Sequence, residues 1–277
     1  MGAGTGPRHL DAIEDDGAFG SEAGEPLDLW LGEASLATDV PESRQQHFEL
    51  ASRGDRVPGR LLLPASRSGP YPLVLLQHGL GGSKLAPYVL AAAGPWVRGG
   101  AAVASIDFPL HGERASAKLP PDLLRGLVGS TDGPPALPVA LVRQAVTDLR
   151  RTLDALVAHP LLDASRVVYA GFSMGAMLGA LFCAADARPR AAALALAGAG
   201  LGPPEVDPAR FIARLAPRPL LLVNAERDEV VPRSAAEALY AAAGQPKQIV
   251  WFDSNHTGLR GVALKAMWSF MRPQLGL

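Results

Sequence analysis

Six short runs of apolar residues recur along the chain of 277 residues and restrict the folds that it can adopt. Apart from a polar residue at one end of four runs and Ser105 within a fifth, each run is continuously apolar rather than alternating, which is typical of parallel strands that helices cover on both faces. The six runs are residues 73–77, 102–106, 166–170, 191–197, 220–224 and 248–252. Helical patterns between several of them predict a doubly wound, mostly parallel α/β sheet.

Two further strands and three helices complete the expected architecture. Residues 47–52 and 57–63 are predicted to pair as an antiparallel N-terminal hairpin, because a turn that contains Gly54 separates them. The sheet is therefore expected to contain eight strands. Helices are predicted over residues 142–157, 174–185 and 234–243, and the apolar side chains of the first recur every 3.6 residues.

The N-terminal segment and the rest of the chain differ in charge, although the formal net charge is only −1. Residues 1–40 carry nine acidic side chains and one basic side chain, whereas residues 41–277 carry a net charge of +7. Residues 1–45 are therefore predicted to form an acidic extension, either disordered or docked on the basic body over part of a site. Within the main domain, residues 46–277, residues 113–140 fit no strand or helix and predict a short lid insertion.

The composition excludes several classes of function. A net charge of −1 lacks the basic excess expected of proteins that bind nucleic acids or membrane surfaces. No apolar run approaches the about 18 to 20 residues that span a bilayer. The single cysteine and the absence of a Cys/His cluster with zinc-ligand spacing lead us to expect no metal. The lack of a secretory signal leads us to expect a cytoplasmic protein.

A candidate nucleophile, Ser173, lies at the centre of the motif GFSMG, residues 171–175. The motif follows a predicted strand and opens a predicted helix, which is the setting of a nucleophile elbow. Glycines two positions before and after the serine let the strand and the helix approach closely around a strained turn. The helix N-terminus also directs free backbone N–H groups toward developing negative charge. We predict nucleophilic catalysis by Ser173; an ordinary tight turn is the alternative.

Candidates for the general base and its orienting acid follow later strands. His256 is the only histidine after Ser173, and it follows the last predicted strand. The preferred acid is Asp228, which follows the preceding strand, with Glu226 and Glu229 as alternatives. A serine, an acid and a histidine in this chain order predict a catalytic triad.

A glycine-rich turn, HGLGGSK at residues 78–84, follows the first of the six apolar strands. Its backbone N–H groups are expected to point into the site, and the N–H groups of Leu80 and Met174 are the predicted oxyanion hole. The turn does not fit a nucleotide site. A dinucleotide fingerprint needs glycine where Lys84 stands, and a phosphate-binding P-loop needs a lysine before the serine, whereas Lys84 follows Ser83. We expect no cofactor.

Phe108 and His111 lie in the loop DFPLHGER, residues 107–114, which follows the strand at 102–106. The loop begins at the sheet edge where the triad candidates are expected, so we predict that both residues face the substrate. A purely structural role is the alternative for each. Leu80, Met174 and the leucines of residues 113–140 are further candidates for an apolar acyl pocket, with a place in the core as the alternative.

Together these motifs resemble the α/β-hydrolase superfamily, in particular its dienelactone-hydrolase-like and acyl-peptidase-like serine esterases. The resemblance covers residues 46–277 and rests on GRLLLP, HGLGGSK, DFPLHGER, GFSMG and PRPLLLVNAERDEVVP before SNHTG. It implies the α/β-hydrolase fold, with Ser173, Asp228 and His256 as the triad. Ala225 departs from the pattern, since many relatives have glycine there, and the DFPLHGER loop differs from the commoner glycine-rich version.

The resemblance implies a serine hydrolase that cleaves a small-molecule carboxylic ester through an acyl-enzyme intermediate, without a cofactor. A serine peptidase or amidase of the acyl-peptidase type is one alternative, because the same site serves both reactions. A catalytically silent α/β-hydrolase that acts as a binding module is the other, and the complete set of triad candidates argues against it. The sequence leaves the acyl group, the alcohol and the oligomeric state open.

Overall fold

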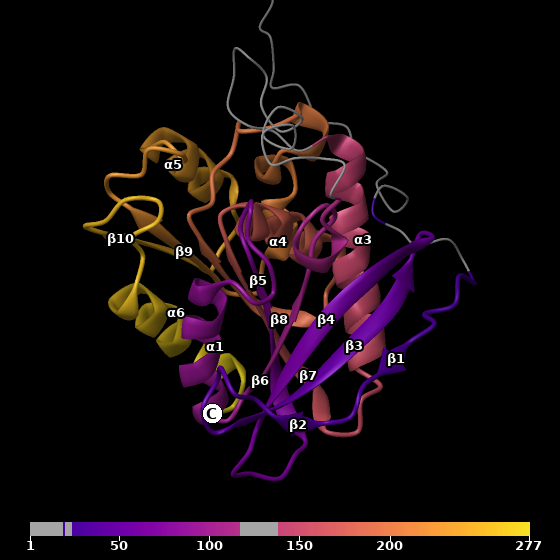
Figure 1. Ribbon diagram of the computed structural model, residues 1–277. Coiled ribbons are helices and arrows are strands. Elements are labelled where there is room, and N and C mark those ends of the chain that lie inside the picture. The colour runs from indigo at the N-terminus through magenta and orange to yellow at the C-terminus, as the bar shows by residue number, and fades with distance from the viewer. Residues whose placement is uncertain (1–18, 20–23, 117–137) are drawn as a thin grey trace, which may run out of the picture.

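The computed structural model describes residue 19 and residues 24–116 and 138–277, which build one mixed sheet with helices on both faces (Figure 1). The strands of the described part are β1 (Trp30–Leu31), β2 (Ser35–Leu36), β3 (Ser43–Ser52), β4 (Asp55–Pro64), β5 (Tyr71–Gln77), β6 (Ala102–Ile106), β7 (Leu162–Phe172), β8 (Pro189–Ala195), β9 (Leu220–Ala225) and β10 (Lys247–Phe252). Their order is β1-β3-β4-β6-β5-β7-β8-β9-β10, and β2 also pairs with β3.

Six adjacent strands, β6-β5-β7-β8-β9-β10, are parallel, and each contains one of the six apolar runs, except that residues 196–197 of the fourth run lie beyond the end of β8. The hairpin of β3 and β4 is antiparallel and joins the parallel part where β4 pairs with β6. The prediction of a doubly wound, mostly parallel sheet with an antiparallel N-terminal hairpin is thereby confirmed.

The predicted number of eight strands is wrong, because the described sheet has ten. The two additional strands, β1 and β2, have two residues each and pair antiparallel with the outer edge of β3. Their side chains are exposed, so they carry no apolar pattern from which a strand is predicted.

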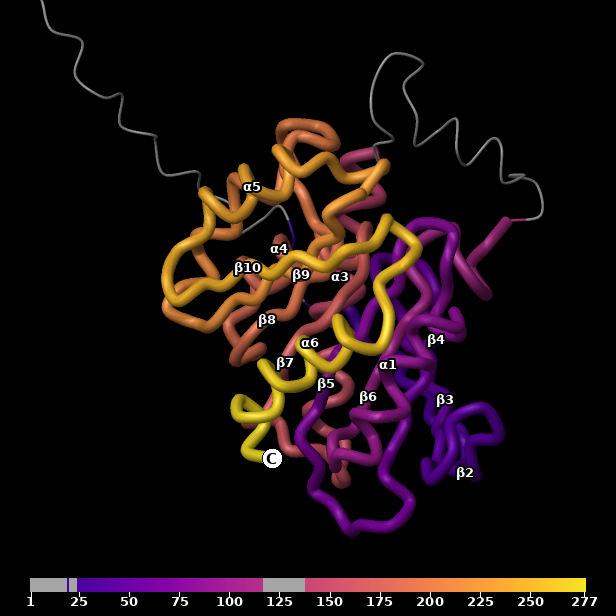
Figure 2. The backbone as a smooth tube through the Cα atoms, turned by 90° about the vertical axis from the view of Figure 1, so that its left-hand side faces the viewer, coloured from indigo at the N-terminus to yellow at the C-terminus, as the bar shows by residue number. Residues whose placement is uncertain are grey.

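Helices form a layer on each face of the sheet. Those of the described part are α1 (Pro87–Arg98), α3 (Val139–Leu156), α4 (Met174–Ala185), α5 (Arg233–Ala242) and α6 (Gly261–Gln274). Buried side chains of α3 and α4 belong to one hydrophobic cluster, and those of α1 and α6 belong to a second cluster across the sheet. The view of Figure 2 looks onto the layer of α1 and α6. Within this layer the rings of Trp96 and Trp268 stack, with centroids 6.3 Å apart.

Four short 3₁₀ helices lie in loops of the described ranges, η1 (Gly112–Arg114), η2 (Pro204–Val206), η3 (Pro208–Arg210) and η4 (Ile212–Leu215). The three predicted helices correspond to α3, α4 and α5, whereas α1 and α6 were not predicted. None of the helices in the described ranges is both long and apolar enough to cross a bilayer.

The predicted extension and lid are only partly within the described residues. Arg151 of α3 donates hydrogen bonds to the backbone carbonyls of Glu25 and Pro26, and Arg150 donates one to the carbonyl of Phe19. This part of the acidic segment therefore contacts the body. Most of the predicted lid, including its leucines, lies outside the described residues.

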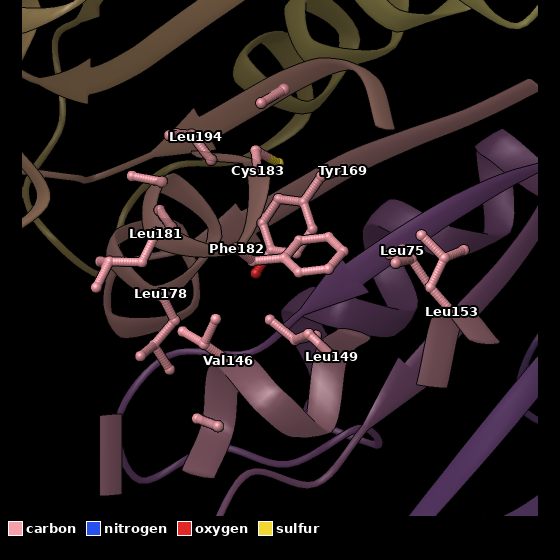
Figure 3. Close-up of a cluster of buried hydrophobic side chains, with 14 of the residues drawn as sticks. Leu75, Val146, Leu149, Leu153, Tyr169, Leu178, Leu181, Phe182, Cys183 and Leu194 are labelled. Atoms are coloured by element: carbon pink, nitrogen blue, oxygen red, sulfur yellow. The ribbon is translucent and has the colours of Figure 1, made fainter. Parts of the chain in front are cut away.

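The hydrophobic cluster between the sheet and the layer of α3 and α4 supports the turn that contains Ser173 (Figure 3). Val146, Leu149 and Leu153 of α3 belong to it together with the buried ring of Tyr169 on β7. The hydroxyl of Tyr169 donates a 2.6 Å hydrogen bond to the carbonyl of Gly175 in the first turn of α4. The core thus fixes the start of α4 as well as its packing face.

Gly179→Ala is expected to lower the free energy of unfolding by about 1–3 kcal/mol. A Cβ atom at Gly179 would overlap the ring of Tyr169, which cannot swing away without losing the bond to Gly175. Gly261→Ala is the matched control, because a Cβ there meets nothing within 4 Å and alanine favours helix. Urea unfolding of the two variants and the wild type measures the difference; equal stability of the two variants would contradict the packing argument.

Candidate active site

Ser173 occupies a strained turn between β7 and α4. Its backbone has φ 51° and ψ −116°, a region that non-glycine residues rarely adopt. The flanking glycines make the turn possible: a Cβ at Gly171 would lie 2.5 Å from the carbonyl oxygen of Gly175. A Cβ at Gly175 would overlap the carbonyl oxygen of His78, the residue that follows β5. Larger residues at either position would push α4 away from the sheet.

A chain of hydrogen bonds connects Ser173, His256 and Asp228. His256 Nε2 lies 3.0 Å from Ser173 Oγ, and His256 Nδ1 lies 2.9 and 2.8 Å from the two carboxylate oxygens of Asp228. The three residues follow β7, β10 and β9, whose carboxyl ends lie at one edge of the parallel sheet. The structure therefore brings together the three residues that the chain order predicted.

Asp228 is held in place by its own backbone turn. Its Oδ1 accepts hydrogen bonds of 2.8 Å from the N–H groups of Val230 and Val231, and its side chain is only 4% exposed. Glu229, an alternative acid, instead accepts a 3.3 Å hydrogen bond from the backbone N–H of His256. Glu226 is exposed. Of the three acids, Asp228 is the one whose carboxylate contacts the imidazole.

The arrangement has the geometry for proton transfer from a serine hydroxyl. The imidazole can accept the Ser173 proton at Nε2 while Nδ1–H donates to a buried carboxylate, which fixes the tautomer and stabilises an imidazolium.

Leu80 and Met174 line the same cavity as Ser173 and His256. Within the described residues, neither backbone N–H donates a hydrogen bond to a protein group, so both are free to bind a ligand oxygen. Gly79 packs against Ser173, since a Cβ there would lie 3.2 Å from Ser173 Cβ. The two amides are therefore available in the cavity that contains Ser173, and the oxyanion hole stays a prediction.

Tyr88 of α1 is a residue of the site that sequence reasoning missed. It lines the cavity, and its hydroxyl oxygen accepts a 2.8 Å hydrogen bond from the N–H of Gly79. Its ring also meets the ring of Phe172 edge-on, with centroids 5.3 Å apart. The only available signal was its position shortly after the glycine-rich turn, and α1 was not predicted.

A buried ion cluster anchors the glycine-rich turn from behind. Lys84 Nζ lies 2.5 Å from Asp107 Oδ2 and 2.5 Å from Glu113 Oε1, while the backbone N–H of Lys84 donates to Asp107 Oδ1 at 2.8 Å. The side chains of Lys84 and Asp107 are each 1% exposed. Because each buried charge has an opposite partner and further hydrogen bonds, the cluster fixes the end of the turn.

His78, at the start of the turn, is buried and neutral. Its Nδ1–H donates to the carbonyl of Gly79 at 2.8 Å, and its Nε2 accepts from the N–H of Phe108 at 3.2 Å. Burial lowers the pKa of His78 to about 4. The neutral form joins the glycine-rich turn to the loop after β6.

Phe108 and His111 do not line the cavity; the structure places both side chains in the interior. Their rings contact His78, with centroid distances of 5.0 and 5.2 Å, and His111 Nδ1–H donates to the carbonyl of Pro109. The loop does begin at the expected edge of the sheet, but its side chains turn back to pack behind the glycine-rich turn. Burial also lowers the pKa of His111.

The cavity beside Ser173 has a volume of about 430 Å³ and a mostly apolar surface. It lies among the glycine-rich turn, α4, the start of α3 and the segment of residues 201–208. Within the described ranges, no group of three His, Cys, Asp or Glu side chains is arranged to hold a metal ion.

Comparison with known proteins gives two family matches. Residues 26–197 match the family described as Acetyl xylan esterase (AXE1), and residues 138–259 match the family described as Phospholipase/Carboxylesterase. No curated protein sequence gives a significant match.

Several solved structures share the fold. A cold-adapted esterase from an Arctic intertidal metagenomic library is 23% identical, with a TM-score of 0.69 over 88% of this chain and 98% of that chain. Acetyl xylan esterase 1 from Thermoanaerobacterium sp. JW/SL YS485 is 18% identical, with a TM-score of 0.71 over 94% of each chain. A putative dienelactone hydrolase from Klebsiella pneumoniae is 19% identical, with a TM-score of 0.65 over 90% and 98%.

The buried neutral His78 predicts that stability falls in mild acid. Its pKa is about 4 in the folded state and near 6.5 in the unfolded state, so only the unfolded chain gains this proton between these pH values. Lowering the pH from 7 to 5 should therefore reduce the free energy of unfolding by about 2 kcal/mol through this group. His78→Asn should lose this part of the pH dependence. Urea unfolding at both pH values measures it; the same decrease in wild type and variant would refute the assignment.

Proposed function

The chain belongs to the acetyl xylan esterase (AXE1) family and is an α/β-hydrolase that hydrolyses carboxylic esters, and we propose that Ser173, His256 and Asp228 perform this reaction through an acyl-enzyme. The observation that carries the proposal is the continuous set of hydrogen bonds from Ser173 Oγ through both nitrogens of His256 to the Asp228 carboxylate. The substrate is a small-molecule ester.

In the first step, Ser173 Oγ attacks the ester carbonyl carbon while His256 Nε2 takes the hydroxyl proton. The carbonyl oxygen becomes an oxyanion, and the N–H groups of Leu80 and Met174 donate to it. Asp228 accepts from His256 Nδ1–H throughout and stabilises the imidazolium. Collapse of the tetrahedral intermediate breaks the bond to the alcohol oxygen, which takes the proton from His256 Nε2.

In the second step, water attacks the acyl-enzyme carbonyl as His256 Nε2 removes a proton from it. The same two amides hold the second oxyanion. Collapse then breaks the bond to Ser173 Oγ, which regains its proton from His256, and releases the carboxylic acid. The proposed steps use only residues of this chain and water.

Ser173→Ala is expected to lower kcat for p-nitrophenyl acetate by about 10⁴ to 10⁶ and to abolish labelling by a fluorophosphonate probe, since the attacking oxygen is absent. Ser165→Ala is the matched control, because Ser165 is an exposed serine at the far end of β7. It should retain both the labelling and the turnover. Wild-type turnover by Ser173→Ala would refute the proposal.

Asp228→Asn is expected to lower kcat by about 10⁴, less than Ser173→Ala, because an amide can favour the wrong tautomer of His256. Folding should change little, since the amide oxygen can still accept from the backbone N–H groups of Val230 and Val231. Glu229→Gln is the comparison, as this carboxylate contacts the backbone of His256 and not its ring. Equal losses in the two variants, measured by steady-state kinetics, would contradict the role of Asp228.

A further inference from the structure

The cavity beside Ser173 is much larger than the reacting groups need, and it lacks charge. Its polar side chains are those of Tyr88, Ser173, His256 and Thr257. The other described residues that line it are apolar or glycine, and none of them is Asp, Glu, Lys or Arg. Such a surface accommodates an apolar group, whereas an ionic or sugar-like group would lose its hydration there without compensation.

One wall of the cavity is a face of α4. Met174, Met177, Leu178 and Leu181 lie at positions i, i+3, i+4 and i+7 of the helix, and all four line the cavity. With a rise of about 1.5 Å per residue, this face extends for about 10 Å from the amide of Met174. The apolar wall therefore begins at the proposed oxyanion hole and leads away from it.

The facing wall comes from two other segments. Val142 lies in the first turn of α3, and Leu201 and Val206 lie in the segment that follows β8. In this segment η2 packs against α3. The two walls together line one apolar slot beside Ser173.

We propose that this slot is an acyl-chain site and that the protein prefers esters of medium-length apolar carboxylic acids, such as octanoyl esters, over acetyl esters. The inference rests on the proposed function and assigns its substrate class. An acetyl group would leave most of the 430 Å³ without a contact. Each further methylene buried in the slot raises kcat/KM by up to about fourfold.

The chain in the slot belongs to the acid rather than to the alcohol. His256 must protonate the leaving oxygen, so the alcohol lies beside His256, where the cavity is lined by Thr257. The carbonyl oxygen is bound at the N-terminus of α4, and the acyl chain continues along the apolar face of the same helix.

Two substrate sets test this proposal. With p-nitrophenyl acetate, butyrate, hexanoate and octanoate, kcat/KM is expected to rise at least tenfold from acetate to octanoate. Ethyl octanoate and octyl acetate are isomers, and the first should be hydrolysed at least tenfold faster. A maximum at acetate, or faster hydrolysis of octyl acetate, would overturn the acyl-chain assignment.

Met177→Trp tests the position of the slot. Met177 is half-buried and projects into the cavity, so the larger ring should block it and lower the octanoate-to-acetate ratio of kcat/KM at least tenfold. Leu36→Trp is the control, because Leu36 is 74% exposed on β2, and it should keep the wild-type ratio. Leu201→Trp narrows the slot from the facing wall if Met177→Trp does not fold. An unchanged ratio in a folded slot variant overturns the proposal.

The same assays separate the two levels of the argument. Hydrolysis that depends on Ser173 but is fastest for acetate overturns the acyl-chain site and leaves the proposed function standing. Failure of the wild type to hydrolyse any of these esters overturns both.

Discussion

The contact between the Ser173 turn and the end of β5 determines the geometry of the whole site. Gln77 of β5 is paired in parallel register with Gly171 of β7, so the glycine-rich turn and the turn of Ser173 leave the sheet at the same level. Gly175 then approaches the carbonyl of His78 so closely that a Cβ would overlap it. This approach is what brings the glycine-rich turn and the turn of Ser173 together.

Two pairs of buried charges lie behind the glycine-rich turn and do not line the cavity that contains Ser173. Lys84 and Asp107 are both 1% exposed, and they neutralise one another below the glycine-rich turn. Arg114 pairs with the fully buried Asp148 in the same way, which joins the loop after β6 to α3. Buried ions with partners stiffen the surrounding loops without exposing a charge to the cavity. The hydrogen bonds of His256 therefore act next to an apolar surface, where electrostatic interactions are stronger.

The sheet and the three hydrogen-bonded residues of the site could be predicted from the sequence, but the positions of several residues around them could not. Continuous apolar runs identify buried parallel strands, and the chain order then assigns Ser173, Asp228 and His256 to one edge. By contrast, α1 contains Gly94 and Pro95, which interrupt a helical pattern. Because this helix was not predicted, the place of its residue Tyr88 in the site was not predicted either. The prediction that Phe108 faces the substrate was wrong, because strand order locates a loop but does not determine where its side chains point. Only the packing against His78 decides that.

The two faces of α4 explain how one helix serves both the chemistry and the substrate. Gly175 and Gly179 lie on the face toward the sheet, where absent side chains let the helix approach β5 and Tyr169. Met177 lies on the face toward the cavity, where side-chain volume sets the room for an acyl group. Substitution on the first face displaces Ser173, whereas substitution on the second changes the slot and leaves the turn in place. Substrate length can therefore change within this fold without loss of the reacting geometry.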